Sequence, residues 1–236
     1  MNSSDQFAGF ILAGGASSRM GCPKALLDFG GSPLILHTVV LLKPLVASVT
    51  VVGPPSQYAA LGLSVIADDV SAHAECDGPC GPLAGIATAL AATHAPWNLI
   101  VACDLPYLSS AWLEWLLARA LRSQGEAVIP RSEYGMEPLA AVYRRECAAP
   151  LAAALAQGVR KASEAIARLQ VEFLDRAEWS EIDPSERILK NMNSPKDYEE
   201  ARKWWQSGRE RESGLQKAQE TTAVTGVESA IRSSPE

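Results

Sequence analysis

The residues best suited to chemistry stand close together near the start of the chain, in the stretch LAGGASSRMGCPKALL that completes an apolar run. Gly14 and Gly15 lack a Cβ and can take backbone angles closed to other residues, so an anionic ligand can approach the main-chain N–H groups closely. Arg19 offers a planar fork of donors and Lys24 a mobile point charge, and both suit phosphate oxygens. We predict a loop that binds a polyphosphate.

This loop differs from two better-known glycine loops. A Walker A loop has a glycine four residues before its Gly-Lys pair and a Ser or Thr after the lysine, whereas Lys24 follows Pro23 and precedes Ala25. A dinucleotide fingerprint has glycines at its first, third and sixth positions, whereas Gly14 and Gly15 are adjacent. The sequence therefore favours neither of these two chemistries.

Two acids follow predicted strands, and ligands of doubly wound sheets bind at such carboxyl ends. Asp104 comes directly after the apolar run 99–103 and can hold Mg²⁺ together with water and phosphate oxygens. As a helix cap it would be redundant, because Ser109 and Ser110 are available for that role. Asp68 follows a predicted strand over 64–67 and either hydrogen-bonds a base or ribose or caps a solvated loop.

Apolar runs and helical segments must position these groups. We predict strands over 7–12, 48–52, 64–67, 99–103, 127–130, 139–143 and 171–174. Helices are predicted over 34–42, 82–93, 112–121 and 148–157, after the basic pair at 160–161, and from 195 to 205. This order predicts a three-layer αβα fold with a mostly parallel, Rossmann-like sheet and the active site along the carboxyl edge of the strands.

Composition excludes several classes of protein. With 236 residues, 47% hydrophobic and 20% charged, the chain is an ordinary globular one, and a formal net charge of −6 argues against nucleic acid or anionic lipid as a partner. The sequence shows no secretory signal or membrane span, so we expect a cytoplasmic protein. The five cysteines are odd in number and irregularly spaced, and the pair in CDGPC at 76–80 is interpreted as unpaired loop thiols.

The predicted organisation is a single domain over 1–205 followed by a disordered tail over 206–236, which is polar and nearly free of large apolar residues. Within the domain we distinguish a nucleotide half, about 6–125, from an acceptor half, about 126–205. His37, without a partner carboxylate or histidine nearby in the sequence, is interpreted as a packing or surface residue.

The glycine loop resembles the nucleotidyltransferase signature LAGGxSxRMGxxKxLL, and within that superfamily the chain is most similar to molybdenum cofactor guanylyltransferases. The motifs GPLAG at 81–85, CDxP at 103–106 and NMNSP at 191–195 follow in the order of that family. The resemblance implies transfer of GMP from MgGTP to the phosphate of molybdopterin or its molybdenum form, with release of pyrophosphate. It also implies transient contact with molybdopterin-handling proteins or molybdoenzymes.

The resemblance further implies a role for each matching residue. The catalytic residues would be Arg19, Lys24 and Asp104, with Asp104 as the Mg²⁺ ligand. The nucleotide-binding residues would be Leu12, Ala13, Gly14, Gly15, Lys24, Asp68 and Asp104. The acceptor-binding residues would be Arg160, Lys161, Asn191 and Asn193.

Several alternatives stay open. LAGG rather than LAAG goes with guanine in the family, but Pro23 before Lys24 also occurs in the cytidylyl branch, so a molybdopterin cytidylyltransferase or a sugar- or polyol-phosphate nucleotidyltransferase remains. A non-catalytic nucleotide-binding protein is a further alternative, against which the set of Arg19, Lys24 and Asp104 argues. The NMNSP segment can equally serve as the cap of the helix that follows it.

Overall fold

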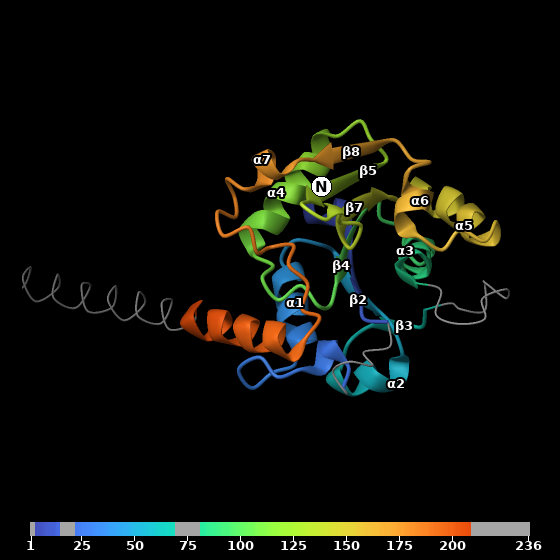
Figure 1. Ribbon diagram of the computed structural model, residues 1–236. Helices are drawn as coiled ribbons and strands as arrows, with labels where there is room; N and C mark the ends of the chain where they lie inside the picture. The colour runs from blue at the N-terminus through green and yellow to red at the C-terminus, as the bar shows by residue number, and fades with distance from the viewer. Residues whose placement is uncertain (1–2, 15–21, 69–80, 209–236) are drawn as a thin grey trace, which may run out of the picture.

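Within the described residues, helices cover both faces of one eight-stranded sheet (Figure 1). The structure is a computed structural model that describes residues 3–14, 22–68 and 81–208. Its strands are β1 Phe7–Leu12, β2 Ser48–Val52, β3 Val65–Ile66, β4 Trp97–Ala102, β5 Ala127–Ser132, β6 Gly135–Met136, β7 Ala140–Arg144 and β8 Val171–Leu174. Its helices are α1 Leu34–Leu42, α2 Pro55–Tyr58, α3 Gly81–Ala91, α4 Ser110–Arg122, α5 Ala148–Ala156, α6 Ala162–Ile166, α7 Arg176–Trp179 and one over 195–208.

The strand order is β3-β2-β1-β4-β7-β5-β6, and β8 also pairs with β5. Strand β1 runs parallel to β2 and β4, and β5 runs parallel to β8. Strand β7 is antiparallel to both β4 and β5. The sheet is therefore mixed but mostly parallel, as predicted. Strands β5 and β7 are antiparallel because the short segment between them, which contains β6, has no room for the crossover connection that a parallel pair requires.

The register of β1 brings two predicted ligand sites to one edge. Leu12, the last residue of β1, pairs with Val52 on one side and with Ala102, the last residue of β4, on the other. The Cys103 N–H then donates to the Leu12 carbonyl over 3.0 Å. The chain segments that follow β1 and β4 consequently leave the sheet side by side, which places the start of the glycine loop next to Asp104.

The apolar core lies in two layers, one on each face of the sheet. All six residues of β1 and all six of β4 are buried, as the residues of strands covered on both faces should be, and Asn98 is the one polar side chain among them. On one face they pack against residues of α1 and α4, namely Ile35, Leu42, Trp112 and Leu116. On the other face they pack against residues of α3, α5 and α6, namely Leu83, Leu90, Leu151 and Ile166. These two layers confirm the three-layer fold.

The elements that were predicted differ from the observed ones at their ends, and three short elements, α2, β6 and α7, were not predicted. The strand expected over 99–103 begins two residues earlier, at Trp97, and the edge strand β3 is shortened to Val65–Ile66. The last helix continues to 208 rather than 205. Other expectations concern Gly15, Arg19, the CDGPC segment and the tail beyond 208, all of which lie outside the described residues. In the described part of the chain, no helix is both long enough and apolar enough to cross a membrane.

Candidate active site

Lys24, Asp104 and Asn193 meet at the carboxyl edge of the sheet. The Lys24 ammonium donates to Asp104 Oδ2 over 2.8 Å and to Asn193 Oδ1 over 2.7 Å. The Lys24 and Asp104 side chains are 18% and 20% exposed, so solvent and ligands still reach the pair. Three residues from three separate motifs, each predicted to act on substrate, therefore form one polar cluster.

Lys24 is held in this cluster by a short turn of 3-10 helix, Lys24–Leu26, that follows Pro23. The Leu26 N–H donates to the Pro23 carbonyl over 2.9 Å, and the next residue, Ala25, is buried in the core. Because Ala25 faces inward, the neighbouring lysine faces the sheet edge. The proline that separates this loop from a Walker A sequence thus begins the turn that carries the lysine.

Asp104 is held in place by a main-chain hydrogen bond, which leaves its carboxylate available to bind Lys24 or a ligand. Its carbonyl accepts from the Met192 N–H over 2.9 Å, which ties the NMNSP segment to the end of β4. Helix α4 is capped instead by Ser109, whose Oγ accepts from the Trp112 N–H over 3.4 Å, so the cap role considered for Asp104 falls to the serine. Burial, with the adjacent Asp104 charge, raises the pKa of the Cys103 thiol to about 12 and keeps that sulfur neutral.

Asn193 is placed by the cap of the last helix. Ser194 Oγ accepts from the Asp197 N–H over 3.2 Å, while Asp197 Oδ2 accepts from the Asn193 and Ser194 N–H groups over 3.1 and 2.9 Å. The Ser194 hydroxyl also donates to Asp197, and this hydrogen bond is the largest of the effects that lower the pKa of the Asp197 carboxyl. Both interpretations of NMNSP therefore hold locally: Ser194 caps the helix, and Asn193 directs its side chain to Lys24.

The helix over 195–208 is anchored to the nucleotide half by three aromatic contacts that sequence reasoning missed. The ring pairs are Phe29 with Tyr198, His37 with Trp205, and Tyr107 with Trp204, at centroid distances of 5.6, 4.7 and 5.2 Å. The seven-residue spacing of Tyr198 and Trp205 was a usable signal, because it puts both rings on one helix face. His37 is thereby confirmed as a packing residue.

Gly30 makes this docking possible. A Cβ on Gly30 would lie 2.1 Å from Trp205 Cζ3, and its φ of +66° lies in the left-handed region that favours glycine. In Figure 1 the last helix, in orange, lies across α1 at the lower part of the molecule. Asn193 and Lys24 are thus brought together by packing of the last helix against the segment 29–37 and Tyr107.

The start of the glycine loop is braced by Tyr58 and Gly53, which were also missed. The buried Tyr58 hydroxyl donates to the Ala13 carbonyl over 2.9 Å, and burial raises the pKa of that phenol to about 12. The Ala13 N–H donates to the Val52 carbonyl over 2.8 Å. A Cβ on Gly53 would lie 3.1 Å from the Ala13 carbonyl, so a side chain there would have to push this segment away by a few tenths of an ångström. The sequence feature that could have indicated this contact is GPPSQY, a segment whose Gly and Pro residues are typical of a tight turn.

Asp68 lies beside the same loop, on the β3 side of the sheet. Its Oδ1 accepts from the Thr88 hydroxyl of α3 over 3.2 Å, and its Oδ2 lies 3.6 Å from where a Cβ on Gly14 would stand. The carboxylate is half-buried. Helix α3 comes close because Gly85 of GPLAG packs against Leu12, whose Cδ1 would lie 3.0 Å from an added Cβ. The structure therefore brings Asp68 to the glycine loop, as the nucleotide-binding prediction requires.

The predicted acceptor residues are not all gathered at the Lys24 cluster. The Arg160 guanidinium donates over 3.0 Å to the carbonyl of Leu155, in the last turn of α5, and over 3.2 Å to that of Val159, beyond the helix. Lys161 is exposed, at the start of α6. Asn191 is exposed, two residues before Asn193. Among the predicted acceptor-binding residues of the described chain, only Asn193 hydrogen-bonds to Lys24, which in turn donates to Asp104.

The cluster suits a hard divalent cation. It offers one carboxylate and one amide oxygen within reach of a single ammonium, and in the described residues no group of three or more His, Cys, Asp or Glu side chains forms an all-protein metal cage. Mg²⁺ prefers oxygen ligands and commonly uses one or two protein groups, with water and substrate phosphates completing its octahedron. The donor set therefore fits a cation that arrives with a nucleoside triphosphate.

Comparison with known proteins agrees with this geometry. Residues 9–172 match the family model described as the MobA-like NTP transferase domain. A probable molybdenum cofactor guanylyltransferase of Synechococcus elongatus is 37% identical over 200 residues, covering 82% of this chain and 96% of that protein. A molybdenum cofactor guanylyltransferase of Pseudomonas putida is 33% identical over 186 residues, covering 78% of this chain and 92% of that protein.

A similar solved structure is that of molybdopterin-guanine dinucleotide biosynthesis protein A from Archaeoglobus fulgidus. The TM-score is 0.72 at 26% sequence identity, with 85% of this chain and 99% of that chain covered. The similarity therefore extends over most of this chain and nearly all of that protein.

Proposed function

Because the chain belongs to the MobA-like NTP transferase family, we propose that it transfers GMP from MgGTP to the terminal phosphate of molybdopterin, or its molybdenum form, and releases pyrophosphate. The observation that carries the proposal is the meeting of Lys24, Asp104 and Asn193 through one ammonium group. An ammonium and a carboxylate that are both reachable from solvent at one point can serve a triphosphate and its cation together.

Each side chain of the cluster has a different role in the proposed reaction. Asp104 would hold Mg²⁺, with the Asn193 amide oxygen beside it, and Mg²⁺ when bound offsets the negative charge of the phosphates. Lys24 would stabilise the triphosphate and the departing pyrophosphate, because a flexible ammonium can turn its donors from the present acceptors to phosphate oxygens. We assign the same function to Arg19.

No protein nucleophile is required for the reaction. The acceptor phosphate is itself an oxyanion, so the enzyme must align it with the α-phosphorus and reduce the repulsion between two anions. The main-chain N–H groups of the glycine loop, braced at its start by Tyr58, would donate to the nucleotide. Asp68, held by Thr88 beside Gly14, would read the nucleoside.

Guanine is favoured as the base because the relatives named above are guanylyltransferases and because the chain carries LAGG after the first strand. The test is pyrophosphate release with GTP or CTP, each with and without molybdopterin and with and without Mg²⁺. We expect release only with GTP, molybdopterin and Mg²⁺ together. Release with CTP would move the enzyme to the cytidylyl branch, and no release with either nucleotide would contradict transferase activity.

The proposal also includes finer assignments. Magnesium is the expected cation, the cytoplasm the expected location, and transient contact with molybdopterin-handling proteins or molybdoenzymes the expected means of exchange. Two observations support the division into a nucleotide half and an acceptor half. Asp68 and the start of the glycine loop lie at the β3-β2-β1 side of the strand order, whereas the basic pair at 160–161 follows α5.

A further inference from the structure

Glu137 is a half-buried carboxyl group at the carboxyl edge of the sheet that the proposed mechanism does not use. Its Oε1 accepts from the Ser132 hydroxyl over 2.5 Å, and Ser132 Oγ accepts in turn from the Tyr134 N–H over 3.1 Å. Among the described residues, no lysine, arginine or histidine forms an ion pair with Glu137. Burial raises the pKa of this carboxyl, and the hydrogen bond from Ser132 acts in the opposite direction.

Glu137 and Asp104 stand on the same edge. The Ala102 N–H donates to the Leu139 carbonyl over 2.8 Å, which extends the pairing of β4 and β7. Asp104 lies two residues beyond this hydrogen bond along one strand, and Glu137 lies two residues before it along the other. Since an extended residue spans at most about 3.6 Å, each Cα lies within about 7 Å of that hydrogen bond.

Glu137 is nevertheless on the acceptor side of the reacting groups. Its N–H donates to the Pro130 carbonyl over 2.9 Å, so it belongs to the β5-β6 hairpin rather than to β4. In the strand order, β5 lies on one side of β4, and β3, where Asp68 follows, lies on the other. Asp68 and Glu137 are therefore two carboxylates placed on opposite sides of Asp104.

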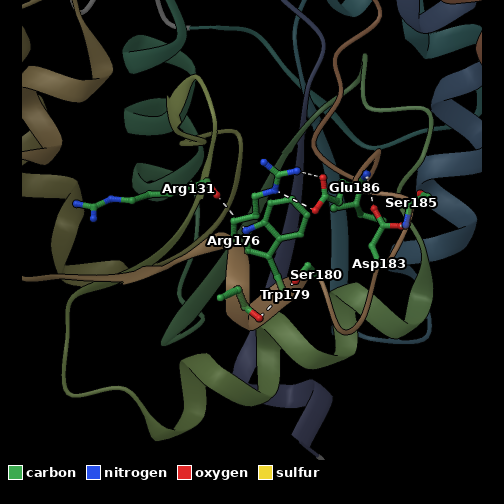
Figure 2. A network of polar contacts seen from close by, with 9 residues as sticks. Arg131, Arg176, Trp179, Ser180, Asp183, Ser185 and Glu186 are labelled. Carbon is green, nitrogen blue, oxygen red and sulfur yellow. Dashed lines mark hydrogen bonds and ion pairs between the residues drawn. The ribbon is translucent and has the colours of Figure 1, made fainter.

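The hairpin that carries Glu137 is braced from behind. Figure 2 shows the Trp179 indole of α7 directed at β5, where its Nε1 donates to the Arg131 carbonyl over 3.0 Å. The Arg131 guanidinium extends away from this point and lies 3.8 Å from the centroid of the Phe173 ring, with Asp175 as its ion-pair partner at 3.6 Å. Arg131, the basic residue of the hairpin, therefore interacts with Phe173 and Asp175 and not with Glu137, so it does not neutralise the Glu137 carboxyl group.

A carboxyl group in this position selects the kind of ligand group that can face it. The phosphate end of the acceptor would be repelled by it, whereas two adjacent N–H donors would each find an acceptor oxygen. Molybdopterin carries its phosphate at one end and a 2-amino-4-oxopyrimidine ring, with an N–H and an amino group side by side, at the other. Guanine carries the same edge, but the Asp68 side of the sheet is assigned to the nucleotide.

We propose that Glu137 binds the 2-amino-4-oxopyrimidine edge of the pterin acceptor, while Ser132 orients its carboxyl group. This inference rests on the proposed function. It makes Glu137 a specificity-determining residue that fixes the end of the acceptor remote from the reacting phosphate. Its loss should weaken acceptor binding and leave nucleotide binding unchanged.

The test compares Glu137→Gln with Glu133→Gln, a matched change at an exposed position of the same hairpin. Glutamine keeps the shape and can still accept from Ser132, but its amino group meets the donors of the ligand. Steady-state turnover should show the KM for molybdopterin raised about 10-fold or more, because the ligand loses hydrogen bonds to a charged acceptor. The KM for GTP and the values for Glu133→Gln should stay within about twofold of the parent.

Direct binding separates this inference from the proposed function. Turnover of the unaltered enzyme tests the function, and equilibrium dialysis with molybdopterin or GTP tests each affinity of the variant. An unchanged affinity for molybdopterin in a folded Glu137→Gln protein would overturn the inference even if the enzyme is an active guanylyltransferase. A weakened affinity for GTP instead of molybdopterin would also overturn it, since the carboxyl would then face guanine.

Discussion

Lys24 in the nucleotide half and Arg160 in the acceptor half both donate hydrogen bonds to oxygen atoms, but these oxygen atoms are of different kinds. Lys24 Nζ donates to side-chain oxygens, those of Asp104 and Asn193. The Arg160 guanidinium donates to main-chain carbonyls, that of Leu155 in the last turn of α5 and that of Val159 beyond its end. One cation belongs to a cluster of movable side chains, and the other donates to main-chain oxygens at and after a helix end.

This difference separates a site residue from a structural one. Main-chain carbonyls at and just after a helix end keep their positions for as long as the fold exists, so a guanidinium that donates to them is committed to the fold. A carboxylate and an amide can rotate and accept from other donors, so an ammonium that holds them can turn to a phosphate. We therefore expect Lys24 to act in the reaction, Arg160 to act in stability, and the exposed Lys161 to supply charge for the acceptor phosphate.

The largest effect is expected from the carboxylate of the cluster. Asp104→Ala removes the proposed cation ligand and leaves Lys24 without its charged partner, so Mg²⁺-dependent pyrophosphate release should fall by about 10²-fold or more. Circular dichroism should show a retained fold, because the main-chain bond from Met192 to residue 104 does not need the side chain. A folded variant with full activity would remove Asp104 from the mechanism.

The next effect is that of the ammonium itself. Lys24→Ala should lower turnover by at least about tenfold with the fold kept, because the phosphates lose a positively charged donor. Lys43→Ala is the matched control, since Lys43 is an exposed lysine at the end of α1, away from the polar cluster. Equal losses in the two variants would indicate a general effect of charge rather than a role in the site.

A smaller loss is expected at Asn193. Asn193→Ala removes one acceptor from the Lys24 ammonium but leaves Ser194 and Asp197 to cap the last helix, so turnover should fall about three- to tenfold. Thermal unfolding should change by little, because the cap is intact. A large drop in the unfolding temperature with unchanged turnover would assign Asn193 to stability and weaken the distinction between the two cations.

The basic pair at 160–161 offers the finest comparison. Arg160→Ala should lower the free energy of unfolding by about 1 kcal/mol, measured as a shift of the urea midpoint, with turnover near that of the parent. Lys161→Ala should leave the midpoint unchanged and raise the KM for molybdopterin a few-fold. The reverse pattern, with Arg160 controlling the KM and Lys161 the midpoint, would contradict the roles proposed here.

Much of the fold followed from local patterns. Strands β1, β2 and β8 and helix α1 have the predicted bounds, because mainly apolar or β-branched runs bordered by Gly, Pro or polar residues leave few alternatives. The family and the three-layer architecture are confirmed as well. The ends of β4 and the length of the last helix were less predictable, since such boundaries depend on pairing and docking with distant segments.

The sequence predicted which residues belong to the site, but it did not predict which of them contact one another. Lys24 and Asp104 were identified from their places after strands and within motifs, but the contact of Lys24 with Asn193 joins positions 169 residues apart. Tyr58 and Gly30 were missed because each acts through a single close approach, to Ala13 and to Trp205, that no local pattern encodes.

The sequence by itself determined which groups are available: a glycine loop, acids at strand ends and a capped last helix, all set by local propensity and periodicity. Only the tertiary structure decided which of them meet. Packing of the last helix on Gly30 and His37 sets the position of Asn193, and the pairing of β4 with β7 brings Glu137 to the edge that holds Asp104. These contacts depend on the fit of surfaces far apart in the chain, so they form only when the whole core is in place.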